Sequence, residues 1–84
     1  MIHELKIKKE YALEKLRKNK LFEIRNNDRF FSVGDTVYYT VIDDISLNEY
    51  FKDLFFEITY ITDFHQRKNY VVFGEREIKG NFNE

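Results

Sequence analysis

Three charged residues, Lys20, Glu23 and Arg25, lie in a short segment whose apolar residues keep strand spacing, and this is the strongest chemical signal in the chain. On a β-strand, Glu23 and Arg25 lie on one face, and Phe22 and Ile24 lie on the other. A strand that buries its two apolar residues would present a fixed carboxylate and a fixed guanidinium outwards. We interpret this pair as suited to a phosphate, a base edge or a polar substrate.

Lys20 has the opposite parity to Glu23 and Arg25, so it joins them only if a bulge or turn near Asn19 redirects it. Where the three converge, Lys20 offers a point charge to a phosphate, and Arg25 offers a planar fork to a phosphate or a guanine edge. Glu23 would orient Arg25 or accept from an exocyclic amine. Spacing alone also allows an ordinary surface Glu–Arg pair, worth under about 1 kcal/mol.

The charged segment is part of a longer pattern, which continues as Asn27-Asp28-Arg29 and Val33-Gly34-Asp35. Together with Lys20, Glu23 and Arg25, it resembles the signature of the ASCH (activating signal cointegrator homology) family, a branch of the PUA-like superfamily, in a small group from bacteria and their phages. Three further segments are similar to that group, namely His3-Glu4-Leu5-Lys6-Ile7, Tyr60-Ile61-Thr62-Asp63 and Tyr70-Val71-Val72.

The resemblance implies an RNA- or nucleotide-binding module with a charged cleft around the Lys-x-x-Glu-x-Arg strand. The binding residues that we expect in this cleft are Lys20, Glu23, Arg25, Arg29, His3 and Lys6. Some ASCH relatives are hydrolases of modified nucleosides or RNA, which is the alternative function. Lys20 would then act as base or nucleophile with a lowered pKa, and Glu23, Glu75 or Glu77 would relay the proton. A third possibility is an adaptor that docks through an exposed strand edge.

One position departs from the family signature, because Lys18 stands where the signature has glycine. We expect Asn19 to supply the unusual backbone conformation there, since asparagine tolerates the left-handed region. The residue types at positions 27–29 favour a turn that Asx side chains close. Arg29 would then pair with Asp28 or Glu23, or it would contact the ligand. Gly34 is expected to give the backbone freedom for a tight entry to a strand.

The two histidines, His3 and His65, show no metal-ligand spacing, and the chain has no cysteine, so we predict no metal site. The glycines are isolated and form no phosphate loop, and no cofactor is expected. His3 would line the cleft or find a backbone partner at a strand start. Both interpretations stay open.

Composition predicts one domain over residues 1–84, cytoplasmic and without a membrane segment, with 18% aromatic residues supplying much of the core. Residues 1–30 carry nine Lys/Arg against five Asp/Glu, whereas residues 31–64 carry one against seven. The basic part would attract a polyanion locally, and the acidic part favours a short or single-nucleotide ligand.

Lys8, Lys9 and Lys15 are each expected to be solvated. Five rings are candidates either for core packing or for base stacking: Tyr38, Tyr39, Tyr60, Tyr70 and Phe64.

Hydrophobic periodicity predicts an α+β fold, with one N-terminal helix after the first strand and about five strands in a small curled β-barrel. The helix is expected over residues 9–18, with Ala12, Leu13 and Leu16 as its apolar stripe. Strands are expected over residues 3–8, 20–26, 36–42, 54–62, 70–73 and 76–78, with a loop and a helical turn over 43–52 and a frayed tail from Gly80. The resemblance implies the same PUA-like architecture. The sequence does not indicate an oligomeric state.

Overall fold

The computed structural model describes residues 1–78, and within them two helices and five strands follow one another along the chain. Our expectation of a frayed tail from Gly80 lies outside the described residues. In chain order the elements are β1 (Ile2–Ile7), α1 (Lys9–Leu16), β2 (Phe22–Asn26), β3 (Thr36–Val41), α2 (Ile45–Phe51), β4 (Phe56–Thr62) and β5 (Tyr70–Glu77). The predicted α+β class, with five strands and a helix after the first strand, is confirmed.

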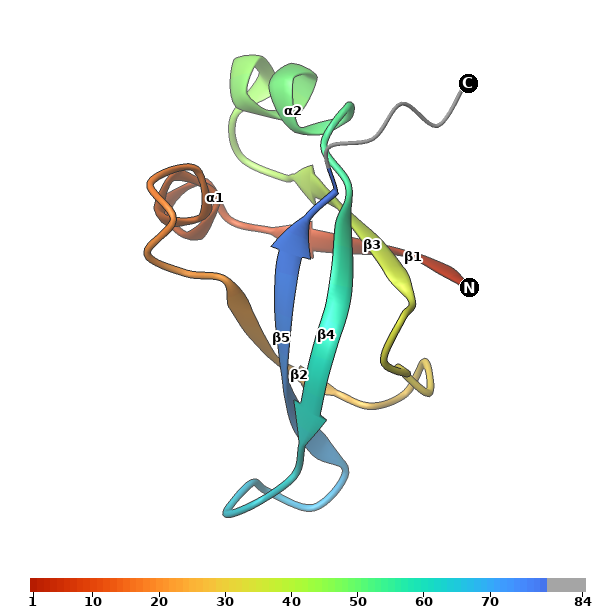
Figure 1. Ribbon diagram of the computed structural model, residues 1–84. Coiled ribbons are helices and arrows are strands. Elements are labelled where there is room, and N and C mark those ends of the chain that lie inside the picture. Colours follow the sequence, from red (N-terminus) through yellow and green to blue (C-terminus); the bar gives the residue numbers. More distant parts are fainter. Residues whose placement is uncertain (79–84) are drawn as a thin grey trace.

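The five strands form one curled sheet in the order β1-β3-β4-β5-β2, with β1 and β2 at its edges. Strand β1 is parallel to β3, and the other neighbours are antiparallel. The long β4–β5 pair crosses the direction of β1 and β3, and α1 lies beside the end of β1 (Figure 1). A register shift between Ile58 and Tyr60 interrupts the β4–β5 ladder, as a bulge does when it bends a strand.

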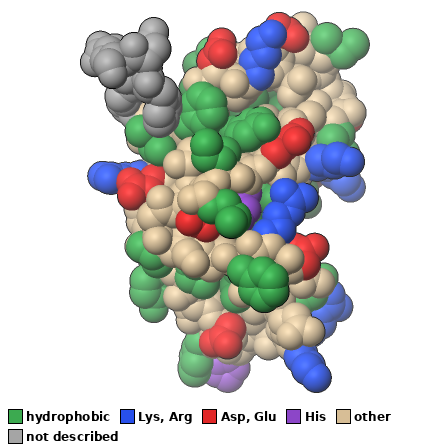
Figure 2. All heavy atoms as spheres, turned by 90° about the vertical axis from the view of Figure 1, so that its right-hand side faces the viewer, with side chains coloured by type: hydrophobic (Ala, Val, Ile, Leu, Met, Phe, Trp, Pro, Cys, Tyr) green, Lys and Arg blue, Asp and Glu red, His purple; other side chains and the backbone are tan. Residues whose placement is uncertain are grey.

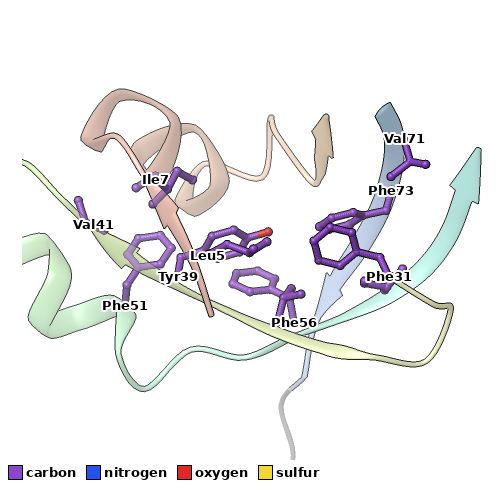
Figure 3. Close-up of a cluster of buried hydrophobic side chains, with 12 residues drawn as sticks. Leu5, Ile7, Phe31, Tyr39, Val41, Phe51, Phe56, Val71 and Phe73 are labelled. Carbon is purple, nitrogen blue, oxygen red and sulfur yellow. The ribbon is translucent and has the colours of Figure 1, made fainter. Parts of the chain in front are cut away.

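Aromatic rings fill the space enclosed by the curled sheet, as the composition predicted. Alternate residues of β1 and β3 point inwards, and they meet Phe56 of β4 and Phe73 of β5 (Figure 3). Phe31, from the connection between β2 and β3, packs with its ring centroid 5.1 Å from that of Phe73. Phe51 of α2 is fully buried and covers the end of this core. The enclosed face of the sheet is therefore the side on which any buried polar group must find a partner.

Helix α1 is shorter than the sequence predicted because Lys18 ends it. The Lys18 backbone has a φ of 63°, and its N–H donates to the Lys15 carbonyl, while the Asn19 N–H donates to that of Glu14. This pair of bonds is the Schellman arrangement, which places a left-handed residue just after a helix. Our expectation that Asn19 would supply the left-handed conformation is wrong, since the residue at the signature glycine position adopts it.

Two other elements differ from their predicted form. Residues 45–51 form a helix rather than a loop with one turn, because the Asp44 side chain accepts the Leu47 N–H at 2.9 Å and caps it. Strand β5 continues through Gly74 to Glu77 instead of ending there, since Gly74 keeps its ladder partners, Phe22 of β2 and Tyr60 of β4. The predicted strands 70–73 and 76–78 are thus one strand.

The orientation of β2 is the largest correction to the sequence analysis. Phe22 and Ile24 are 41% and 55% exposed, whereas Glu23 is 4% exposed and points inwards. In the register with β5, Glu23 lies opposite the fully buried Phe73 and on the same inner face. The apolar stripe of α1 is similarly rearranged, because the helix buries Ala12 and Lys15 but leaves Leu13 and Leu16 more than a third exposed.

On the face of the molecule shown in Figure 2, acidic and basic side chains are interspersed, and hydrophobic side chains are exposed between them. The surplus of basic residues near the N-terminus therefore forms no single-sign patch on this side. Within residues 1–78, no helix is long and apolar enough to cross a membrane.

The left-handed backbone at Lys18 gives a test of the helix end. We expect Lys18→Gly to raise the free energy of unfolding by about 0.5–1 kcal/mol, because glycine adopts this conformation without a Cβ clash. Lys18→Ala is the matched control, since it removes the same charge but keeps the Cβ. Urea unfolding measures both variants, and a Gly variant no more stable than the Ala variant would contradict the assignment.

Candidate functional site

A buried charge cluster, formed by Lys15, Glu23, Glu75 and Tyr39, lies between α1 and the inner face of β2, β3 and β5. The Lys15 Nζ is fully enclosed and lies 2.7 Å from the Glu23 Oε2 and 2.8 Å from the Glu75 Oε2. It also donates to the backbone carbonyls of Lys20 at 3.3 Å and Phe22 at 3.4 Å. Acceptors therefore surround an ammonium that has three protons to donate.

Tyr39 completes the cluster from β3. Its hydroxyl donates to the Glu75 Oε1, and the Lys15 Nζ lies 4.7 Å from the centroid of its ring. Burial raises the pKa of the Tyr39 hydroxyl well above its ordinary value, and the neighbouring Glu75 adds to that rise. Tyr39 thus stays a neutral donor. Within residues 1–78, every buried side-chain nitrogen or oxygen has a hydrogen-bond partner.

The two carboxylates that share Lys15 have pKa values displaced in opposite directions. Burial acts to raise the pKa of Glu23, but the charges and hydrogen bonds of Lys15 and Lys20 outweigh it, and the pKa is lowered. For Glu75, burial is the stronger effect and raises the pKa, although Lys15 and Tyr39 oppose it. Glu23 is therefore the ionised partner, and Glu75 is the one more readily protonated.

Two arginine side chains bridge the seam between the edge strands β1 and β2. Arg25 donates from Nε to the Glu23 Oε1 at 3.0 Å and from Nη2 to the carbonyl of Lys6 at 2.8 Å. Arg29, in the connection after β2, donates from Nη1 to the carbonyl of Glu4. The guanidinium groups thus occupy carbonyls of β1 that face the seam. Arg29 bonds to β1 and not, as the sequence analysis expected, to Asp28 or Glu23.

A groove of about 430 Å³ opens at the α1 end of this seam, and we call it the seam groove. The end of β1, the first turn of α1 and β2 form its walls, together with Lys20. Its lining consists of Lys6, Ile7, Lys8, Tyr11, Lys20, Phe22, Glu23, Ile24 and Arg25. Four of these residues are cationic and one is anionic, so the groove has a net positive charge.

Lys20 lies at the centre of the polar contacts in the seam groove. Its Nζ is 2.8 Å from the Glu23 Oε2 and 3.0 Å from the carbonyl of Phe22. The same atom is 5.4 Å from the ring centroid of Tyr11 and 5.1 Å from that of Phe22. The turn that follows Lys18 brings Lys20 back to β2, so Lys20 and Glu23 meet despite their opposite parity.

The structure brings together Lys6, Lys20, Glu23 and Arg25 in the seam groove, and it places the other two predicted residues elsewhere. His3 is buried, with its Nε2 2.8 Å from the Asp35 Oδ2 and its ring against Phe31. Its partner is therefore a side chain and not the backbone. Arg29 lies farther along the seam, where it bonds to β1. Whether any of these residues binds nucleic acid stays a prediction.

Asn27 and Gly34 have the structural roles that their residue types indicated. The Asn27 Oδ1 accepts the Phe31 N–H at 2.9 Å, and Gly34 has a φ of 95°. Among the candidate proton relays, Glu75 contacts Lys15, whereas Glu77 lies 4.0 Å from Lys18 and does not line the seam groove.

The prediction that Lys15 is solvated is wrong, since its side chain is fully buried. One signal was present: Lys15 follows Ala12 by three positions, which places both on one helix face. Glu75 likewise continues the alternation of Val71 and Phe73 on the buried face of β5. The signal for the buried pair was therefore a lysine on the buried face of the helix together with a glutamate on the buried face of a strand.

Among residues 1–78, no group of three or more His, Cys, Asp or Glu side chains is placed to hold a metal ion. A family model described as "Domain of unknown function (DUF3850)" matches residues 2–74, which is most of the chain. No curated protein matches the sequence.

The enclosed ammonium of Lys15 leads to a prediction about stability. Lys15→Met keeps the side-chain length but leaves Glu23 and Glu75 buried without their shared cation, so we expect the free energy of unfolding to fall by about 3–5 kcal/mol at neutral pH. Adding Glu23→Gln and Glu75→Gln to the same chain should recover most of this loss. Urea unfolding measures both variants, with Lys9→Met as the exposed control. A loss below about 1 kcal/mol for Lys15→Met would contradict the buried pairing.

The opposite pKa displacements predict a non-monotonic pH dependence of stability. Because the pKa of Glu75 is raised on folding, acidification from neutral pH towards the ordinary glutamate value of about 4.3 favours the folded state. Because the pKa values of Glu23 and Asp35 are lowered on folding, their stabilisation is lost as pH falls further. We expect the free energy of unfolding of Glu75→Gln to lack the rise on mild acidification but to show the same loss at lower pH. Urea unfolding across this range measures it, and a rise of equal size in both proteins would exclude Glu75 as its source.

Proposed function

We propose that this chain, which belongs to the family described as a domain of unknown function (DUF3850), is an RNA- or nucleotide-binding module of the cytoplasm whose site is the seam groove. The observation that carries the proposal is the position of Lys20 between two partly exposed aromatic rings in a groove with a net positive charge. A nucleotide has a phosphate for the cation and a flat base for a ring.

The cations of the groove divide into two kinds, which supports a role in binding phosphate. Arg25 and Lys20 are engaged by Glu23 and by backbone carbonyls. Lys6 and Lys8 are exposed, and no ion pair or side-chain hydrogen bond within residues 1–78 engages their ammonium groups. Lys20 uses two of its three ammonium donors in these contacts and keeps one for a phosphate, and Lys6 and Lys8 remain available to an anion that enters from solvent.

The rings and the size of the groove support a base as the second part of the ligand. Tyr11 and Phe22 are 45% and 41% exposed, although both line the groove. Stacking of a base on such a ring is worth about 1–3 kcal/mol. The volume of about 430 Å³ lies in the range of small-molecule sites, about 300–1,000 Å³. A short single-stranded segment or a single nucleotide is the ligand class that we propose.

A relationship to the ASCH family is part of the same proposal. It is supported by the backbone of Lys18, whose φ of 63° is the conformation that a glycine at that signature position would supply. The Lys-x-x-Glu-x-Arg residues of the signature all line the seam groove, which is where the resemblance leads us to expect them.

A small hydrolase acting on a modified nucleoside or on RNA is the second candidate, and the contact between a lysine and a carboxylate in the seam groove favours it. Lys20 would act as nucleophile or base in the groove, and Glu23, 2.8 Å away, would move its proton. The side chain of Glu75 is fully enclosed, so it would act only through Lys15 or Tyr39.

Binding of a short, fluorescently labelled single-stranded RNA pool to the wild type and Lys20→Ala, measured by anisotropy over a range of salt concentrations, tests the first function. We expect Lys20→Ala to weaken binding at least tenfold and to reduce the slope of log K against log salt by about 0.7, the value for one phosphate contact on a single strand. Lys9→Ala is the matched control, because Lys9 is exposed near the groove but does not line it.

Mass spectrometry of the same incubations, with acylated cytidine nucleosides included, separates the two candidates. Salt-sensitive binding that Lys20→Ala loses, without a change in mass, supports the binding module. A change in mass that requires Lys20 makes the protein a hydrolase instead. Equal binding by Lys20→Ala and Lys9→Ala would place the contact outside the seam groove and contradict the proposal.

A further inference from the structure

A second groove, of about 660 Å³, lies at the opposite end of β2, where the β2–β3 connection meets the turn between β4 and β5. We call it the hairpin groove. Its walls include Asn26, Asn27 and Phe30 on one side and Gln66, Arg67 and Tyr70 on the other. The Asn27 N–H donates to the Asn69 carbonyl at 2.7 Å and joins the two segments. The function proposed above does not use this groove.

Phe30 is the unusual residue of the hairpin groove. Its backbone has a φ of 52°, a conformation that bulky side chains rarely adopt, and its side chain is 81% exposed. The next residue, Phe31, is buried in the core and fixes the local path of the chain. Packing of the Phe30 ring therefore offsets little of the backbone strain, and strain without such compensation is typical of functional positions. The fold holds an aromatic ring out to solvent at the edge of a groove.

The other walls of the hairpin groove suit a base better than a phosphate. Two acidic residues, Asp28 and Asp63, balance Arg67 and Lys68, so the groove has no net charge. The guanidinium of Arg67 lies 4.5 Å from the ring centroid of Tyr70 and forms a second flat surface. Amide side chains from both walls provide donors and acceptors for base edges. The seam groove has the opposite character, with cations in excess.

The two grooves follow one another along a single strand. Phe22 to Arg25 line the seam groove, and Asn26, the next residue, lines the hairpin groove, so the two linings meet at one peptide bond. Strand β2 has five residues and spans about 17 Å. It runs from the α1 side of the sheet towards the β4–β5 turn (Figure 1). Two grooves that follow one another along one strand suit a linear ligand, because consecutive units of such a ligand can occupy both.

We propose that the hairpin groove is a second subsite, which stacks and reads a base of the same single-stranded nucleic acid whose phosphate and neighbouring base bind in the seam groove. This inference rests on the function proposed above and deepens it, since it makes the ligand an oligonucleotide rather than a mononucleotide. Phe30 supplies the stacking ring, and the amides of Asn26 and Gln66 contact the base edge. A footprint of about four nucleotides or more matches the smallest sites of single-strand-binding modules.

Anisotropy with a labelled RNA dinucleotide and a labelled RNA octanucleotide, both single-stranded, tests this inference on the full chain. We expect the wild type to bind the octanucleotide at least fivefold more tightly than the dinucleotide, and Phe30→Ala to remove that gain without changing dinucleotide binding. Phe64→Ala is the matched control, because Phe64 is a ring 72% exposed on the turn between β4 and β5 and does not line the groove. Lys20→Ala should weaken binding of both oligonucleotides.

The outcomes separate this inference from the function on which it rests. If Phe30→Ala binds the octanucleotide as the wild type does, or if both lengths bind equally, the second subsite is overturned while the seam groove stands. If Phe64→Ala loses as much affinity as Phe30→Ala, the effect does not come from the hairpin groove, and the subsite is again overturned. If the wild type binds neither oligonucleotide, both proposals fail.

Discussion

The enclosed ammonium of Lys15 is the interaction on which the arrangement around the seam groove depends. Removing an ammonium and two carboxylates from water costs several kcal/mol per ion, and close pairing must offset that cost. Lys15 brings Glu23 of β2 and Glu75 of β5 to one point on the inner face of the sheet. The orientation of β2 follows from this pairing, and it places Phe22 on the outer face at the groove.

The edges of the sheet present a second constraint. Within residues 1–78, strands β1 and β2 have no ladder partner on their seam sides, and unpaired strand edges are prone to association with other chains. Arg25 and Arg29 reach from β2 and the connection after it to carbonyls of β1. The planar guanidinium, with its several donors, suits this bridging role, because one side chain can bond to a carboxylate and a carbonyl at once. The arginine of the charged motif therefore organises the groove that its neighbours line.

Much of the fold was predictable from local pattern. Alternation identified β1, and β-branched and aromatic residues identified β3. Together with β4, these strands were predicted to within two residues at each end, and the helical spacing over residues 9–18 located α1. The predictions failed where a long-range contact overrode the local preference. Gly74 is compatible with a strand end, yet its partners on both sides extend β5 through it. Residues 45–51 have a weak helical pattern, and the Asp44 cap and the burial of Phe51 make them a helix.

The residue types available for the site could be read from the sequence alone. So could the closeness of Lys20, Glu23 and Arg25, because short spacing limits how far apart side chains can lie. Which of these three side chains face solvent depends on the packing of the whole fold. The parity of a strand tells which residues share a face, but the face that becomes buried depends on what packs against it. Here the burial of Lys15 selected the face with the carboxylate, since a charge removed from water needs its counter-charge within the same enclosure.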